Sequence, residues 1–483
     1  MIDTQAIRSK ILDLAMRGQL TEQLPEDGTA EELYQQILEE KQKLIKEGKI
    51  KKEKPLPEIT DKEIPFEIPE NWKWVRLKEL CTKIVDGDHN PPAGVKEATS
   101  YLMLSAQNIN RGTLTNLDNV RYLSADVFEE ENKRTKLEVD DVLLTIVGTI
   151  GRSCVYQGGF NISFQRSVAV ITTLIYCKFL KYAFDIPFIQ NFMIDNATGA
   201  AQLGFYLNKL EKLLIPLPPN TEQKRIVKKI EQALSVLDTI DELQSQYADN
   251  LTALKSKLID AAIQGKLTEQ LPEDGTAEEL YQQIQEEKQK LIKEGKIKKQ
   301  KPLPEITDEE IPFDIPDNWK WTRFADILDV RDGTHDTPKY VTDGIPLVTS
   351  KNLRKGLIDF ESAKLISYED AKQINNRSRV DDGDILLAMI GTIGNPVLVK
   401  KDREFSIKNM ALFKPIDSNL LDMSYVLYYL KNEERVMQEK ARGGLQPFVS
   451  LKFLRTSIIP LPPLAEQKRI VQKLNELLPL CEN

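Results

Sequence analysis

The chain has only two histidines, His89 and His335, and they lie in matching segments, DGDHNPP and DGTHDTP. A metal site needs several His, Cys, Asp or Glu ligands, and a catalytic triad needs a nucleophile beside its histidine. Neither segment supplies such a set, so we predict no metal site and no catalytic residue here. Their Asp, Asn and Pro content favours an exposed loop. A turn role and a contact to DNA both remain open for the two histidines.

The segment Asn90-Pro91-Pro92 contains the core of the adenine methylase motif, in which an aromatic residue stacks on a flipped base. Ala93 stands at the stacking position, and the second copy reads Asp336-Thr337-Pro338. No FxGxG-like cofactor loop accompanies either copy. We therefore predict a tight turn at both places and no catalysis.

Two GTIG segments, Gly148–Gly151 and Gly391–Gly394, follow apolar runs typical of buried strands. They lack the Lys-Ser/Thr of a P-loop and the third glycine of a dinucleotide fingerprint. We predict turns in which the backbone comes close to a neighbour. Approach to a DNA phosphate by Arg152 is the alternative.

Side chains that suit base recognition gather in the loops predicted after strands. Arg and Lys match guanine, and Asn and Gln match adenine, because their paired donors and acceptors fit the major-groove edges. We expect the DNA face to be formed by sets of such residues, although a solvated surface role stays open for any one of them. The first set is His89, Asn90, Lys96, Gln107, Asn108, Asn110, Arg111, Arg152, Gln165, Arg166 and Gln202. The second set is His335, Lys339, Lys351, Asn352, Arg354, Lys355, Lys408, Asn409, Arg442 and Gln446.

The composition is that of a soluble globular protein, with 41% hydrophobic and 29% charged residues among 483. No apolar run approaches the ~18 residues of a membrane helix, and the N-terminus lacks the pattern of a secretory signal. The four cysteines are scattered without a CxxC pair, which indicates neither a zinc site nor a disulfide framework. We expect a cytoplasmic protein.

The net charge of −8 at first argues against a nucleic-acid partner, because phosphate binding needs clustered Lys and Arg. The average conceals a split: residues 73–212 carry +1, residues 320–455 carry +3, and the rest carries −12. The basic run EEKQKLIKEGKIKKEK has the Glu and Lys spacing of a solvated helix. For this run we favour a solvated face or a surface for partner subunits over nucleic-acid binding.

The elements that must position these residues are duplicated. Residues 268–299 repeat residues 21–52 with one change in 32 positions, Leu38 against Gln285, and PLPPNTEQKRIVKKI recurs as PLPPLAEQKRIVQKL. Between these nearly constant segments lie two units of short apolar runs that differ at most positions. The combination suits a constant frame that holds two interchangeable readers.

A single helix is predicted from Thr221 to about Ile263, because apolar residues recur there at steps of three and four. At ~1.5 Å per residue it would reach about 65 Å. The C-terminal and N-terminal segments match its two ends in sequence, which predicts a second, composite helix beside it and a cyclic pseudo-twofold. We place domain boundaries at 1–71 (N-terminal helical region and Pro-rich connector), 72–214, 215–318 (central helix and connector), 319–458 and 459–483 (partial C-terminal helix).

The chain resembles the specificity subunit of type I restriction-modification systems over nearly its whole length. The resemblance is carried by the paired segments IPFEIPENWKW and IPFDIPDNWKW, DDVLLTIVGTIGR and DGDILLAMIGTIGN, and the paired IPLPP-x-x-EQKRIV exits. It implies a mixed α/β (α+β) fold with two target-recognition domains separated by a pair of long antiparallel helices. The short C-terminal helix departs from the family pattern.

The resemblance also implies a non-catalytic subunit that recognises an asymmetric bipartite site in double-stranded DNA. Its implied partners are two modification (methyltransferase) subunits and restriction (motor-nuclease) subunits, with no membrane. S-adenosylmethionine and ATP would be bound by those partners, and we expect no cofactor in this chain. Two alternatives are a coiled-coil scaffold without DNA contact and a self-contained DNA methyltransferase.

Overall fold

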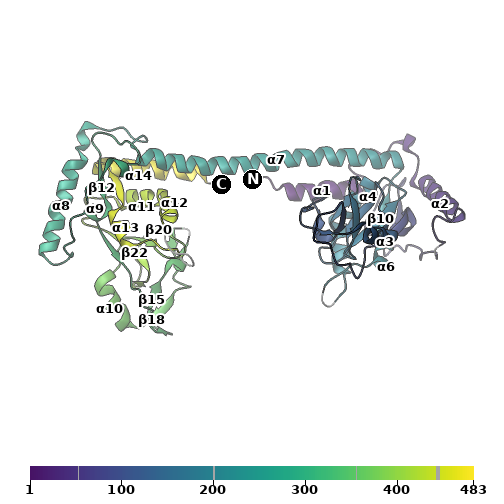
Figure 1. The fold of residues 1–483 in the computed structure, drawn as a ribbon. Helices are drawn as coiled ribbons and strands as arrows, with labels where there is room; N and C mark the ends of the chain where they lie inside the picture. The colour runs from purple at the N-terminus through teal and green to yellow at the C-terminus, as the bar shows by residue number, and fades with distance from the viewer. Residues whose placement is uncertain (53, 200–201, 355, 442–446, 483) are drawn as a thin grey trace. The chain divides into compact units, whose positions relative to one another are not determined.

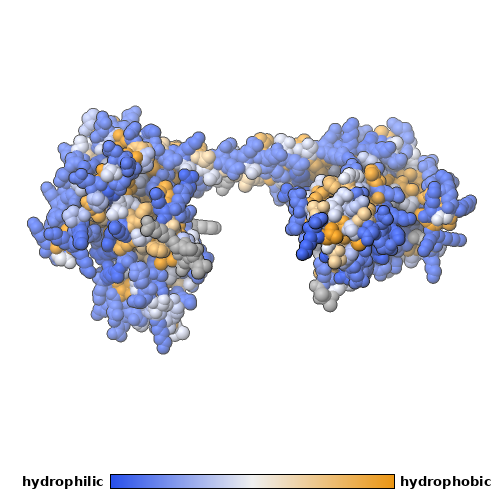
Figure 2. Space-filling model, viewed as in Figure 1, coloured by the Kyte–Doolittle hydropathy of each residue, from blue (hydrophilic) through white to orange (hydrophobic). Residues whose placement is uncertain are grey.

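The computed structural model describes residues 1–52, 54–199, 202–354, 356–441 and 447–482. The chain divides into two compact units, Met1–Ser245 and Gln246–Asn483, and each unit combines helices with small sheets (Figure 1). The surface is mostly hydrophilic (Figure 2). None of the described helices is both long enough and apolar enough to cross a bilayer.

The first unit contains helices and strands in the following order. The helices are α1 (Thr4–Met16), α2 (Ala30–Lys46), α3 (Ala125–Thr135), α4 (Cys177–Phe184), α5 (Pro187–Asp195), α6 (Leu207–Leu210) and the first part of α7 (Asn220–Ile263). The strands are β1 (Lys73–Arg76), β2 (Cys81–Asp86), β3 (Tyr101–Leu104), β4 (Ile109–Asn110), β5 (Thr113–Leu114), β6 (Arg121–Tyr122), β7 (Val142–Thr145), β8 (Ser153–Val155), β9 (Asn161–Phe164), β10 (Val168–Thr173) and β11 (Leu214–Leu217).

The second unit begins with the rest of α7 and then repeats this plan. Its helices are α8 (Ala277–Lys293), α9 (Phe324–Ile327), α10 (Tyr368–Ser378), α11 (Met423–Asn432), α12 (Glu434–Glu439), α13 (Leu451–Thr456) and α14 (Leu464–Leu477). Its strands are β12 (Lys320–Arg323), β13 (Leu328–Asp332), β14 (Tyr340–Val341), β15 (Ile345–Val348), β16 (Leu353–Arg354), β17 (Leu357–Ile358), β18 (Lys364–Ile366), β19 (Ile385–Ala388), β20 (Gly394–Leu398), β21 (Ser406–Ile407), β22 (Met410–Pro415) and β23 (Ile458–Leu461).

A four-stranded antiparallel sheet lies at the centre of each unit, in the order β2-β10-β7-β8 and β13-β22-β19-β20. All four residues of strand β7 are buried, and three of them are apolar, because both faces of the strand are covered. Val142 and Leu144 pack among the helices, and Leu143 packs against the smaller sheet that contains β3 and β9. In the second unit Ile385 and Leu386 divide between the two faces in the same way.

In each unit the recurring EQKR segment is hydrogen-bonded to the tryptophan at the start of the sheet region and to the repeated segment, which begins at Thr21 in the first unit. Glu222, which is fully buried, accepts hydrogen bonds from Trp72 Nε1 (2.8 Å), Thr21 Oγ1 (3.0 Å) and Gln23 Nε2 (3.0 Å). Glu466 accepts the matching bond from Trp319 Nε1 at 2.8 Å. These contacts explain why the repeat, the tryptophans and the exit segments are duplicated together.

Replacing Glu222 with Ala is expected to lower the free energy of unfolding of the first unit by about 1–3 kcal/mol, because buried donors lose their acceptor. Differential scanning calorimetry of the full chain measures the effect. Glu242→Ala, an exposed position on the same helix, serves as the control and should change little. Equal melting temperatures for both variants would contradict the role of Glu222.

The predicted fold class is confirmed, including the long helix α7 of 44 residues. Helix α1 runs antiparallel to α7, since Thr4 bonds to Asp241 (2.5 Å) while Arg8 pairs with Asp238 (2.7 Å). In the second unit α14 shares a core with the end of α7. Each unit thus packs one short helix, α1 in the first and α14 in the second, against its own part of α7.

Helix α7 does not have one continuous buried seam. Ile226, Ile230 and Leu237 are buried, whereas Leu243 and Tyr247 are 57% and 55% exposed. The regular apolar spacing therefore continues into a stretch of α7 where the apolar side chains are exposed.

Candidate nucleic-acid interface

Loops from four strands of the first unit surround a groove of about 450 Å³. Strands β2 and β7 both pair antiparallel with β10, so their C-terminal ends lie at the same edge as the turn that leads into β10. Strand β3 runs parallel to β9 and brings its own C-terminal loop to this edge. We call this the loop groove; it is lined by Asp88, His89, Pro91, Ser105, Ala106, Gln107, Val147, Gly148, Thr149, Gln165, Arg166, Ser167 and Gln202.

Backbone hydrogen bonds hold the loops together. The amide of Asp88 donates to the Phe164 carbonyl (2.8 Å), and the amide of Arg166 donates to the Asp88 carbonyl (2.8 Å). Gly87 is required here, because a Cβ would lie 2.0 Å from the Phe164 oxygen. The second unit repeats the arrangement with Gly333, whose Cβ would lie 2.4 Å from the Ile407 oxygen.

Each histidine is bound by an aspartate three residues earlier. His89 Nε2 lies 2.8 Å from an Asp86 carboxylate oxygen, and Arg134 Nη2 donates to the other oxygen at 2.5 Å. Because the carboxylate accepts, the ring nitrogen that faces it carries the proton. The Asp86 side chain is only 10% exposed while the imidazole is 50% exposed. The aspartate therefore fixes a ring that still faces solvent.

The second unit contains the same cluster. His335 Nε2 lies 3.0 Å from Asp332, Arg377 also pairs with Asp332, and His335 Nδ1 lies 3.0 Å from the side chain of Asn409. Sequence reasoning missed the aspartates and arginines of both clusters. The shared Asp at the third position before each histidine was a usable signal.

Several predicted residues meet in the loop groove. His89, Gln107, Gln165, Arg166 and Gln202 all line it. Gln165 is half-buried and the other four are exposed. Three glutamine side chains and one arginine thus face one space, together with the carboxylate of Asp88, which the prediction did not include. Such groups can form paired hydrogen bonds with adenine and guanine edges.

Asn108 and Asn352 are corrected by the structure, because both are buried, with exposures of 6% and 4%. Asn108 Oδ1 accepts from the Ser105 amide at 3.0 Å, and Asn352 Oδ1 accepts from the Thr349 amide at 2.8 Å. Their amide nitrogens donate to carbonyls further along the loop. These two side chains therefore hold a loop and do not face a ligand.

Other predicted residues of the first unit lie outside the groove lining. Asn90, Lys96, Asn110, Arg111 and Arg152 are exposed. Arg111 lines a different depression beside Lys178 and Lys181. A tight turn was predicted at Asn90-Pro91-Pro92; the chain bends at Asn90 and continues through the two prolines without a turn, and Arg121 donates to the Pro92 carbonyl at 2.7 Å.

In the second unit the predicted residues occupy the matching loops. His335, Lys339, Lys351 and Arg354 are exposed, and Lys408 and Asn409 are half-buried. The bridge of Thr334 with Lys408 corresponds to that of Asp88 with Gln165. Three further predicted positions, Lys355, Arg442 and Gln446, lie outside the described residues.

Cys154 and Cys177 are two of the buried cysteines of the first unit. Cys154 is 1% exposed, and burial raises its pKa to about 12. Burial also raises the pKa of Cys177 to about 11. Both remain protonated thiols at neutral pH and are therefore poor nucleophiles.

Comparison with known proteins supports the resemblance. The chain is 28% identical to the specificity subunit of the type I restriction enzyme EcoAI from Escherichia coli, over 98% of this chain and 89% of that protein. It is likewise 28% identical to the EcoEI specificity subunit of Escherichia coli, over 99% of this chain and 89% of the relative.

Solved structures share the fold. One is the HsdS subunit from Thermoanaerobacter tengcongensis, with a TM-score of 0.52 and 18% identity over 86% of this chain and 91% of that one. Another comes from a study of complex assembly and conformational transition of the type I R-M system, with a TM-score of 0.58, 18% identity, and coverage of 86% and 92%. The sequence profile of the type I restriction modification DNA specificity domain matches residues 69–246 and 316–481. Since these two matches span most of both units, the chain belongs to the family of type I restriction-modification specificity subunits.

Proposed function

We propose that the chain reads an asymmetric bipartite DNA site, with the loops of each unit contacting one half. The observation that carries this proposal is a common loop frame that presents different side chains in the two units. Gln107 corresponds to Lys351, beside the matching loop-holding residues Asn108 and Asn352. The bridges of Asp88 with Gln165 and of Thr334 with Lys408 match in the same way. Different side chains on one frame are expected to select different bases.

The contacts we propose for the first half are His89, Gln107, Gln165, Arg166 and Gln202. For the second half they are His335, Lys351, Arg354, Lys408 and Asn409. Asn90, Lys96, Asn110, Arg111, Arg152 and Lys339 are exposed and are proposed as backbone contacts. Phosphate contacts of this kind set the position on DNA without reading its sequence.

We also propose that methyltransferase subunits dock on α7. Leu243, Tyr247 and Leu254 are 57%, 55% and 45% exposed and continue the apolar spacing of the helix. Apolar residues at steps of three and four favour packing against another helix. Restriction subunits would join through the methyltransferases. The chain itself is proposed to be a non-catalytic cytoplasmic subunit, with S-adenosylmethionine and ATP bound by its partners.

The proposal is tested by comparing the methylated adenines in the host genome with and without this gene. A split motif with two defined halves and an unspecified gap is expected to lose methylation on deletion, and the intact gene should restore it. A scaffold without DNA contact predicts an unchanged methylation pattern. Methyl transfer by the purified chain alone would instead indicate an enzyme.

A further inference from the structure

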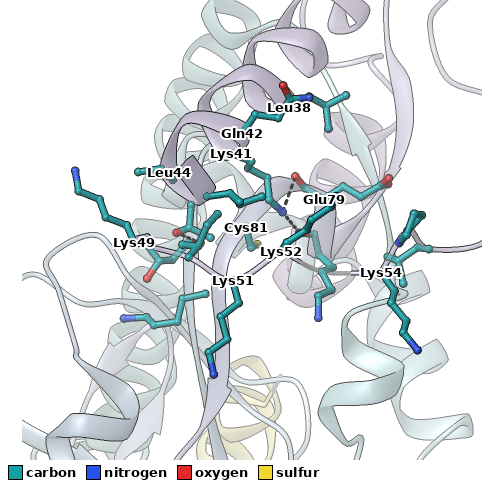
Figure 3. Close-up of a pocket in the computed structure, with 18 of the residues that line it drawn as sticks. Leu38, Lys41, Gln42, Leu44, Lys49, Lys51, Lys52, Lys54, Glu79 and Cys81 are labelled. Atoms are coloured by element: carbon teal, nitrogen blue, oxygen red, sulfur yellow. Dashed lines mark hydrogen bonds between the residues drawn. The ribbon is translucent and has the colours of Figure 1, made fainter. Parts of the chain in front are cut away.

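A second groove, of about 780 Å³, lies in the first unit between α2, the segment that follows it and the start of β2 (Figure 3). Eight lysines and two glutamates line it. We call it the lysine groove and define it by Lys49, Lys51, Lys52, Lys54, Lys83 and Lys136. The lysines labelled in Figure 3 come from α2 (Lys41) and from the segment that follows it (Lys49, Lys51, Lys52 and Lys54).

The segment that carries the lysines is anchored at both ends. Helix α2 ends with Glu47 as its C-cap, and Arg76, which is 5% exposed, donates to the carbonyl of Pro57 (3.0 Å) and pairs with Glu63 (3.0 Å). Lys51, Lys52 and Lys54 lie between these anchors and are exposed. Within the described ranges, these three ammonium groups form no ion pair. Their charges are therefore available to an external anion.

The lysine groove also has an apolar component. Leu38, Leu44, Ile45, Ile50 and Leu56 line it, and none of them belongs to the hydrophobic core of the first unit as described. In the second unit, the copies of three of these residues do belong to a core: Ile297 is buried, and Leu291 and Ile292 pack against the same cluster. The five side chains of the first unit are half-buried, so the duplicated segment adds its apolar side chains to a core cluster in the second unit only.

Sequence differences between the copies explain this asymmetry. The single change in the repeat puts Gln285 where Leu38 stands, and its Nε2 donates to the Asp326 carbonyl at 2.9 Å. Lys83 and Asp329 occupy the same position in the two central sheets. Lys83 lies opposite Thr172 on β10, and Asp329 lies opposite Lys414, which holds the position of Thr172 on β22. The first unit therefore has a lysine and a leucine where the second has an aspartate and a glutamine.

In each unit a lysine pairs with a buried aspartate, but the lysine comes from β2 in the first unit and from β22 in the second. Lys83 pairs with Asp141 at 3.0 Å in the first unit, and Lys414 pairs with Asp384 at 2.5 Å in the second. The core aspartate keeps a cation in both copies. Because Thr172, the counterpart of Lys414, also lines the lysine groove, the two copies differ here by Asp329 and not by the number of lysines.

We propose that the lysine groove binds an acidic amphipathic segment of a partner protein, at one place in each chain. Lysines attract its carboxylates, and the half-buried leucines and isoleucines receive its apolar side chains. A nucleic-acid backbone fits less well, because phosphates supply nothing to cover the apolar residues. The two grooves lie at opposite ends of strand β2: Cys81, its first residue, lines the lysine groove, and the loop groove begins just after Asp86, its last residue. At ~3.4 Å per residue the two ends of this strand are about 17 Å apart.

The binding is tested with the full chain and a fluorescein-labelled peptide of five Leu-Glu-Glu repeats, followed by fluorescence anisotropy. The triple variant Lys51→Glu, Lys52→Glu, Lys54→Glu is expected to raise the Kd at least tenfold. The repeat supplies a matched control, Lys298→Glu, Lys299→Glu, Lys301→Glu, which should change the Kd less than twofold. Leu38→Gln should weaken binding about threefold, and Gln285→Leu should not.

Each contrary result overturns the proposal. Absence of saturable peptide binding by the wild-type chain removes the site, and equal losses from the two triple variants remove its asymmetry. If the first triple variant loses affinity for a mixed-sequence 20-base-pair duplex but keeps affinity for the peptide, the occupant is nucleic acid. Circular dichroism spectra that match the wild-type spectrum confirm that each variant is folded. None of these readouts depends on the proposed bipartite DNA reading, which the methylation motif tests separately.

Discussion

Inserting four residues into α7 between Ile240 and Tyr247 is expected to lengthen the gap of the methylated motif while leaving both halves unchanged. Four residues add about 6 Å to a helix. That length corresponds to roughly two base-pair steps at 3.4 Å each. Methylation at the original spacing should therefore be lost, which makes this the largest functional effect that we predict.

The insertion is measured by sequencing the methylated motif in cells that carry only the altered gene. A variant with Ser245→Ala and Gln246→Ala changes the same place on the helix without changing its length, and it should keep the original motif. Both positions are exposed, so the control is not expected to disturb packing. Retention of the original gap by the insertion variant would contradict a role of α7 in spacing.

Replacing Gln165 and Arg166 with Ala is expected to weaken binding of the assembled complex to its target by about 2–4 kcal/mol, since each paired base contact contributes about 1–3 kcal/mol. That range is roughly a 30- to 1000-fold rise in Kd. Both side chains line the loop groove. The loss should concern one half of the DNA site. Base-pair changes in that half should therefore no longer alter the Kd of the variant.

The matched variant Lys408→Ala with Asn409→Ala should produce the same loss at the other half of the site. Titrations at a fixed salt concentration with duplexes altered in one half at a time separate the two effects. A uniform loss across all duplexes, including unrelated ones, would mean that these residues contact phosphates and do not read bases.

The sequence was sufficient for the parts of the fold that depend on local pattern. The capping box of Thr29 and Glu32 at the start of α2 follows from the local Thr-Ala-Glu-Glu pattern, and the spacing of apolar residues in α7 predicted its extent to within one residue at the start. Duplication also predicted two similar units. These features are set by hydrogen bonds and periodicity within a few turns of chain, so they can be read without a tertiary structure.

The sequence could not separate groove residues from loop-holding residues of the same type. Asn108 and Gln107 are neighbours with similar side chains, yet Asn108 is buried and bonded to its own loop while Gln107 is exposed. The role of Asp86 was missed for a related reason, because Arg134 reaches it from a helix 48 positions away. Burial and long-range pairing depend on how β2, β7 and β10 bring their ends together.

The duplicated frame was thus determined by the sequence itself, and the difference between its two copies became visible only in the tertiary structure. Leu38 and Gln285 are one change in a repeat of 32 positions. The structure shows that this change accompanies Lys83 against Asp329 and a strip of leucine and isoleucine that joins a core cluster in the second unit only. Whether such side chains are covered depends on contacts between segments that are distant in sequence, and these contacts exist only once the chain has folded.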